Sequence, residues 1–126
     1  MEPVDAVAFD AERPLPLARR FDRVLADAPC SGTGTLGRNP DIKWRLEPAD
    51  LADLAARQRR ILANALDAAA PGGAVVYSTC SLEPEENEEI VAAVIAQRPE
   101  WRIEATLERN PGREPGDGFR AFRLTA

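Results

Sequence analysis

The sequence predicts an α/β fold built around a parallel sheet. Three features lead to this fold class: an apolar run over residues 21–26, an amphipathic helical pattern over residues 48–69, and a second apolar run from residue 73 that ends at Cys80. Strand, loop, helix, tight turn and strand in this order form a βαβ crossover, which places the two strands parallel and right-handed. At 126 residues the chain is one domain or a piece of one.

The N-terminal third is expected to contain two strands and two loops. Residues 4–9 are predicted to form a short strand ending at Asp10, and the prolines of residues 13–16 then require a loop. Residues 21–26 are apolar enough for a buried strand, as in a parallel sheet that is covered on both faces. Residues 31–46 contain three glycines and a proline and predict a long loop, a feature that is usually functional in a compact domain.

The remaining elements follow from helical spacing and from turn residues. Pro48 suits the first position of a helix whose apolar stripe continues to Ala69, where residues 71–73 stop it. A second helix is expected to start at Pro84 and to end before Pro99. Strands are predicted at residues 101–107 and 119–124, antiparallel to each other and joined by a turn-rich link.

Both cysteines of the chain lie just past the end of a predicted strand. Because ligands bind at the carboxyl ends of strands in open α/β sheets, Asp27, Cys30 and Cys80 are expected at one crevice if the strands are neighbours. Histidine is absent, which removes Ser-His-Asp and Cys-His catalysis and most zinc sites, and we expect no metal. Two thiols without histidine suggest covalent catalysis, because a thiolate is a good nucleophile and a poor general base.

Charge and hydropathy limit the partners of the chain. The net charge of −5 argues against binding nucleic acid through bulk charge. Of the local basic groups, only Arg38, Lys43 and Arg45, directly downstream of the Cys30 loop, are placed to contact a substrate. No apolar run approaches the roughly 20 residues of a membrane span, and no signal pattern is present. We therefore expect a cytoplasmic protein with reduced thiols and no membrane partner.

Several motifs, in this order, resemble RNA (cytosine-5) methyltransferases of the RsmB/NOP (Sun) family. The resemblance runs from about Asp10 to Leu124, and two cysteine motifs in matching context make it specific. The motifs are residues 27–34, residues 39–45, Gln58 with residues 61–62, residues 77–81, residues 84–87 and residues 116–119.

The resemblance implies a fold and a reaction. The fold is a partial class I, Rossmann-like methyltransferase sheet that lacks its first two strands, so residues 1–126 are expected to be the C-terminal portion of a catalytic domain. The implied reaction transfers a methyl group from S-adenosylmethionine to carbon 5 of cytosine in RNA, here expected to be ribosomal RNA. Cys80 would attack carbon 6 of the base, and Cys30 would help to release the product.

The resemblance also implies binding residues. Asp10 and Asp27 match carboxylates that lie near the cofactor, and Asp27 also lies near the base. Substrate contacts are expected from Asp27, Pro29, Ser31 and Lys43, with Pro29 holding the Cys30 loop extended. Trp44 is either a core residue or a platform on which a base stacks, and the sequence favours neither.

The chain departs from the family pattern at its N-terminal end. The glycine-rich turn and the acidic residue that hold the cofactor in this fold are missing, and without two central strands the edge of the strand ending at Asp27 would be bare. We therefore expect a fragment that self-associates through this edge or has a disordered N-terminus. One alternative is a non-catalytic, methyltransferase-like module that binds RNA or a protein. Another is a thiol redox enzyme, although a Cys-x-x-Cys pair is absent.

Overall fold

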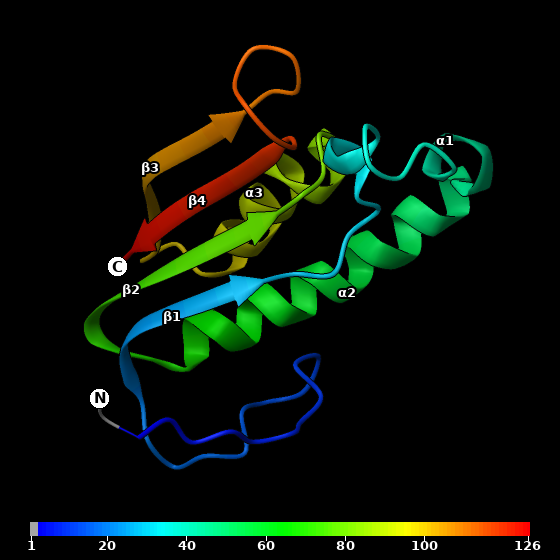
Figure 1. Ribbon diagram of the computed structural model, residues 1–126. Coiled ribbons are helices and arrows are strands. Elements are labelled where there is room, and N and C mark those ends of the chain that lie inside the picture. Colours follow the sequence, from blue (N-terminus) through cyan, green and yellow to red (C-terminus); the bar gives the residue numbers. More distant parts are fainter. Residues whose placement is uncertain (1–2) are drawn as a thin grey trace.

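The computed structural model describes residues 3–126 as a four-stranded sheet with two helices packed on one face (Figure 1). The strand order is β1-β2-β4-β3, with β1 parallel to β2 and with β4 antiparallel to both of its neighbours. The predicted α/β fold and its βαβ crossover are therefore confirmed. The elements are β1 (Phe21–Asp27), α1 (Ile42–Arg45), α2 (Pro48–Asp67), β2 (Ala69–Thr79), α3 (Glu88–Gln97), β3 (Arg102–Arg109) and β4 (Phe119–Thr125).

Helix α2 forms where the helical spacing of apolar residues predicts it. Its start is fixed by a capping box, in which Glu47 and Asp50 each bind the other's backbone N–H, and by Pro48 in the first turn. Leu62 and Leu66 lie on the buried side, one turn apart. The helix ends at Asp67, and β2 begins at Ala69, earlier than predicted. The turn at residues 71–73, where Gly72 has a φ of 78°, is thus built into the start of β2.

The core lies between the sheet and the helices α2 and α3. Along the sheet, Ala26, Tyr77 and Phe122 are in register and face this core. Their neighbours Leu25, Val76 and Arg123 are also in register and point to the other face, where Leu25 is 70% exposed. The expectation that β1 is covered on both faces is therefore wrong, because both helices pack on the same side of the sheet (Figure 1).

The predicted strand at residues 4–9 is also wrong, since no strand forms between residues 3 and 20. A single strand is not stable without a partner, and this segment does not pair with the free edge of β1. Instead it lies along α2, where the side-chain amide of Asn64 donates a hydrogen bond of 3.0 Å to the carbonyl of Ala11 and Arg60 forms an ion pair with Glu12.

The second predicted helix is divided in two. A 3-10 turn at Pro84–Glu86 is followed by a break at Asn87, with φ −120° and ψ −99°, before α3 begins. The break arises because the Asn87 amide donates to the carbonyls of Ser81, at 3.0 Å, and Glu83, at 2.9 Å, and accepts from the Thr79 hydroxyl at 2.7 Å. It fixes Glu86 under the end of β2. The antiparallel pair of β3 and β4 is as predicted.

Candidate functional site

The two cysteines meet at the carboxyl ends of β1 and β2. Cys30 follows β1 by three residues, and Cys80 follows β2 directly. Their sulfur atoms are 3.3 Å apart, and both side chains are half-buried. The prediction that the two thiols lie together at the ends of neighbouring strands is confirmed, because parallel pairing ends both strands at the same edge of the sheet.

Backbone hydrogen bonds tie the two cysteine loops to a third segment. The N–H of Gly34 donates to the carbonyl of Cys80 at 2.8 Å, and the N–H of Gly118 donates to the carbonyl of Gly34 at 2.7 Å. Only glycine fits at position 34, because an added Cβ would overlap the Gly118 carbonyl oxygen and come within 2.6 Å of that of Cys80. Three of the motifs that carry the family resemblance therefore meet at one point.

The side chain of Glu86 lies beneath this point and is fully buried. Its carboxylate accepts hydrogen bonds from the N–H of Ser31 at 2.8 Å, from the Ser31 hydroxyl at 2.7 Å and from the Ser81 hydroxyl. The amide of Gln58 donates both to this carboxylate, at 3.2 Å, and to the carbonyl of Pro29, at 2.7 Å. The residues next to both cysteines are thus bonded to one acidic group.

The environment of Cys30 keeps this thiol protonated. Burial raises the pKa of Cys30 to about 12, and the hydrogen bond and the charge of Cys80 act in the same direction. At neutral pH Cys30 is therefore a thiol that can donate a hydrogen bond to the Cys80 sulfur.

Asp27 and Asp10, the two predicted cofactor ligands, have different surroundings. Asp27 ends β1 with an exposed carboxylate that accepts a 3.0 Å hydrogen bond from Ser78, so it lies beside the cysteine loops. Asp10 is exposed in the segment before β1, where it accepts from the N–H of Glu12 at 2.9 Å and lies 3.7 Å from Arg13. None of its hydrogen bonds or ion pairs within residues 3–126 reaches the cysteine loops.

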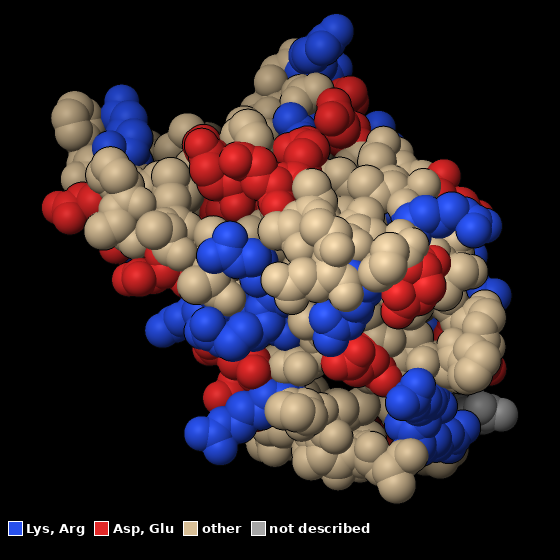
Figure 2. Space-filling model, turned by 180° about the vertical axis from the view of Figure 1, so that it is seen from behind, with Lys and Arg blue, Asp and Glu red and all other residues tan. Residues whose placement is uncertain are grey.

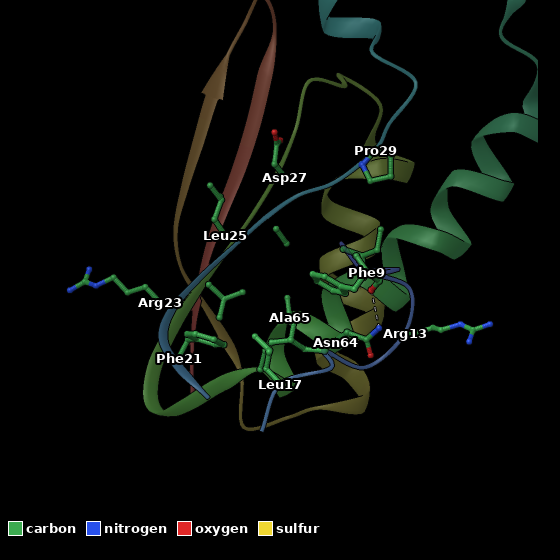
Figure 3. A pocket seen from close by; sticks show the side chains of 16 residues that line it. Phe9, Arg13, Leu17, Phe21, Arg23, Leu25, Asp27, Pro29, Asn64 and Ala65 are labelled. Atoms are coloured by element: carbon green, nitrogen blue, oxygen red, sulfur yellow. Dashed lines mark hydrogen bonds between the residues drawn. The ribbon is translucent and has the colours of Figure 1, made fainter. Parts of the chain in front are cut away.

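An apolar groove of about 430 Å³ runs along the free edge of β1 (Figure 3). Phe9 and Leu17 line it from the N-terminal segment, Phe21 and Leu25 from β1, and Asp27 lies at one end. The groove therefore connects the segment that carries Asp10 with the strand that carries Asp27.

The predicted substrate residues do not all lie at the thiols. Pro29 and Ser31 flank Cys30, and Ser31 and Arg45 line a separate hollow of about 260 Å³ beside it. Lys43 is exposed on α1 and is not part of that lining; its ammonium group lies 4.9 Å from the ring centre of Trp44. Trp44 is 81% exposed, which rules out the core interpretation.

The distribution of surface charge agrees with the negative net charge of the chain, −5, which predicts no broad basic surface. Figure 2 shows acidic and basic side chains interleaved over the face opposite to that of Figure 1, so that face carries no broad basic field. Several of the basic groups are neutralised locally, for example Arg38 by Asp117, at 2.7 Å, and Arg98 by Asp67, at 2.9 Å. Within residues 3–126 no helix is long and apolar enough to cross a membrane, and no cluster of three potential metal ligands occurs.

Comparison with known proteins identifies the family. The family model described as 16S rRNA methyltransferase RsmB/F matches residues 3–122. The chain belongs to this family. The resemblance inferred from the sequence motifs is therefore confirmed, and the sheet is part of a methyltransferase fold.

Known RsmB/F relatives are much longer than this chain. The Ribosomal RNA small subunit methyltransferase B of Klebsiella pneumoniae (strain 342) is 45% identical over 107 residues, which are 79% of this chain and 25% of the relative. The structure of NSun6 from Pyrococcus horikoshii with SFG matches with a TM-score of 0.82 at 27% identity, over 94% of this chain and 33% of the other. A Methyltransferase Homolog Protein from the same organism gives a TM-score of 0.70 at 26% identity, over 85% and 39% of the two chains. The chain thus spans about a quarter of the curated relative.

Three residues of this RsmB/F site were not predicted as site residues. Gln58 and Glu86 belong to motifs of the resemblance, but the sequence gives them no role, and Ser78 is one of several hydroxyl residues at the end of β2. Arg45, which lines the hollow next to Cys30, does belong to the basic group that the sequence places near a substrate, together with Arg38 and Lys43. That basic group was the available signal, but it does not distinguish its members.

Proposed function

We propose that residues 1–126 are the C-terminal portion of the catalytic domain of an enzyme that methylates carbon 5 of cytosine in ribosomal RNA. The observation that carries this proposal is the pair of sulfur atoms 3.3 Å apart at the ends of two parallel strands. The reaction needs a nucleophile that adds to the base and a second group that assists its departure, and two thiols in contact can share these tasks.

The steps assign one role to each thiol. Cys80 loses its proton to solvent and its sulfur forms a bond to carbon 6 of cytosine. The double bond between carbons 5 and 6 opens and its electron pair moves into the ring, which makes carbon 5 electron-rich enough to accept a methyl group. Carbon 5 then loses its proton to a base, the bond from carbon 6 to sulfur breaks, and the electron pair returns to Cys80. Cys30 lies against this sulfur and is protonated at neutral pH, which suits a group that assists the release of Cys80 rather than the initial attack.

S-adenosylmethionine is the cofactor that the family and the NSun6 complex with the analogue SFG support. When bound, it supplies the methyl group. Asp27 fits a cofactor or base contact because its carboxylate is exposed beside the cysteine loops. Asp10 would contribute from the N-terminal segment, which shares the apolar groove with β1. The apolar walls of that groove suit the flat face of a heterocycle.

The RNA substrate is proposed from the relatives, whose names specify ribosomal RNA. A cytosine inside a helix would have to swing out of its stack to reach the thiols. Pro29 and Ser31 would contact the flipped nucleotide next to Cys30, and Lys43 would contact a phosphate. The exposed ring of Trp44 next to Lys43 is a surface on which a base can stack. The cytoplasmic location and the absence of a membrane partner stay predictions.

The test uses this chain joined to the upstream part of its catalytic domain. Cys80→Ala should abolish methyl transfer to a ribosomal RNA substrate, because no bond to carbon 6 can form. Cys30→Ser should instead accumulate a protein–RNA adduct that persists on a denaturing gel and disappears in the double variant. Methylation that survives in Cys80→Ala, or an active enzyme in which Cys30→Ser forms no adduct, would contradict the assigned roles.

A non-catalytic module that binds RNA or a protein is the second candidate. The observation in its favour is the open edge of β1. Within residues 3–126 no further strand pairs with this edge, and none lies between β1, which carries Asp27, and the segment that carries Asp10. This candidate predicts that the joined protein binds RNA but neither methylates it nor forms an adduct.

A further inference from the structure

The buried carboxylate of Glu86 connects the two cysteine loops. One oxygen accepts from the hydroxyls of Ser31 and Ser81, which follow Cys30 and Cys80 directly in the sequence. The other oxygen accepts from the N–H of Ser31 and from the amide of Gln58. Glu86 is thus bonded to both loops, each through the residue next to the cysteine.

The side chains of Glu86 and Gln58 hold the backbone on both sides of Cys30. The carbonyl before it, that of Pro29, accepts from Gln58 at 2.7 Å, and the N–H after it, that of Ser31, donates to Glu86 at 2.8 Å. Gln58 is itself fully buried in α2, and Tyr77 of β2 donates its hydroxyl to the carbonyl of Glu86 at 2.7 Å. The position of the Cys30 thiol is therefore set through Glu86 by elements of the rigid core.

A carboxylate suits this position for a physical reason. All four partners of Glu86 are donors, and only an acceptor at both oxygens satisfies them. Burying such a group costs free energy, and within residues 3–126 no lysine or arginine forms an ion pair with Glu86. The neighbouring Glu85 is exposed and has no such partners. The donors from the two loops are therefore the groups that offset the cost of burial, and they couple the loops to each other.

We propose that Glu86 is a positioning residue that holds the thiols of Cys30 and Cys80 at one reacting centre. The consequence for methyl transfer rests on the proposed function, whereas the positioning itself is a property of this chain. Nothing in this role requires Glu86 to touch the substrate.

How closely the two thiols are held can be tested without any substrate, by measuring the equilibrium constant for forming the Cys30–Cys80 disulfide with oxidised glutathione. One oxidised glutathione takes the chain from two thiols to a disulfide and becomes two reduced glutathione molecules, so two electrons and two protons balance. A disulfide needs sulfurs about 2.05 Å apart, and thiols held at 3.3 Å require only a small approach. The equilibrium constant therefore reports how well the two loops are held together.

Glu86→Gln keeps the shape of the side chain but replaces an acceptor by a donor. We expect the constant for the Cys30–Cys80 disulfide to fall about tenfold, because displacements on the order of 1 Å in a positioned pair have effects of this size or larger. Glu85→Gln is the matched control and should leave the constant unchanged. Val94→Ala, in the core on α3, should lower thermal stability without changing the constant, which separates positioning from general destabilisation.

Two further variants keep the proposal testable if Glu86→Gln does not fold. Ser31→Ala and Ser81→Ala each remove one hydroxyl from the carboxylate, and each should lower the constant, with less than additive effects when combined. A constant that is unchanged or higher in the folded variants would overturn the proposal.

The same variants separate this proposal from the proposed function. If Glu86→Gln lowers the disulfide constant while the joined wild-type protein forms no RNA adduct, the positioning role stands and the proposed function fails. If the joined protein forms the adduct and Glu86→Gln changes neither the constant nor the rate of methyl transfer, the positioning role fails.

Discussion

The Cys30 thiol makes the stability of the folded chain depend on alkaline pH. Its pKa is raised from 9.0 to about 12 by burial and by Cys80, so between these values the folded chain holds a proton that the unfolded chain has lost. The stabilising contribution is therefore complete below pH 9.0 and is lost progressively as the pH rises toward 12. We expect the free energy of unfolding, measured in urea with a reductant present, to decline across this range.

Cys30→Ser isolates the contribution of this thiol. The variant should lose much of the alkaline slope, and the part that remains should include Tyr77, whose pKa burial also raises from 10.0. Equal slopes for the variant and the wild type would show that Cys30 titrates in the folded chain at its ordinary value.

Single residues differ in how far the sequence reveals their roles. The meeting of Cys30 and Cys80 could be predicted because each follows an apolar run, and parallel strands end at the same edge. Glu86 could not be singled out because four other glutamates lie between residues 83 and 89. Its burial depends on the helix break at Asn87, which is set by contacts with the end of β2.

At the scale of elements, Gly34 lets the Cys30 loop pack against the end of β2 and the start of β4. Gly34→Ala would force its Cβ into the carbonyls of Gly118 and Cys80, so the backbone must move. We expect a loss of about 1–3 kcal/mol in the free energy of unfolding, as for overpacked sites. Urea unfolding monitored by tryptophan fluorescence measures it.

The matched control is Gly37→Ala in the same loop. Apart from its own residue and the two adjacent ones, no heavy atom lies within 4 Å of the Cβ that this variant adds, so we expect a change within about 0.5 kcal/mol. A Gly34→Ala variant as stable as this control would mean that the loop can move away from Cys80 without cost.

The same distinction between local and long-range causes explains which elements were predictable. The apolar spacing of α2 and its capping residues are local, and the helix forms at Pro48 as expected. Residues 4–9 have an apolar pattern of their own, but a strand needs a partner, and this segment lies along α2 instead of pairing with the open edge of β1. The early start of β2 likewise depends on the pairing of Ala69 with Phe21 across the sheet.

At the scale of the whole molecule, the two edges of the sheet are protected unequally. β3 forms one edge, and charged residues at four of its eight positions guard it against pairing with another chain. β1 forms the other edge; its three charged residues lie toward its ends, its centre (residues 24–26) is apolar, and Leu25 is 70% exposed beside the apolar groove of Figure 3. An edge of this kind invites another strand, from a second copy or from upstream residues of the relatives' longer chains.

We therefore predict that the 126-residue chain self-associates through β1. Leu25→Lys should shift the chain toward monomer in sedimentation equilibrium, because a lysine on an edge strand would have to be desolvated between copies. Leu107→Lys is the matched control, since Leu107 is also exposed, at 45%, but lies on the guarded strand β3. A wild-type chain that stays monomeric at every concentration, or equal effects of the two lysines, would contradict an interface at β1. When upstream residues are joined to the chain, they should suppress the association by covering the same edge, so that the effect of Leu25→Lys on oligomeric state disappears.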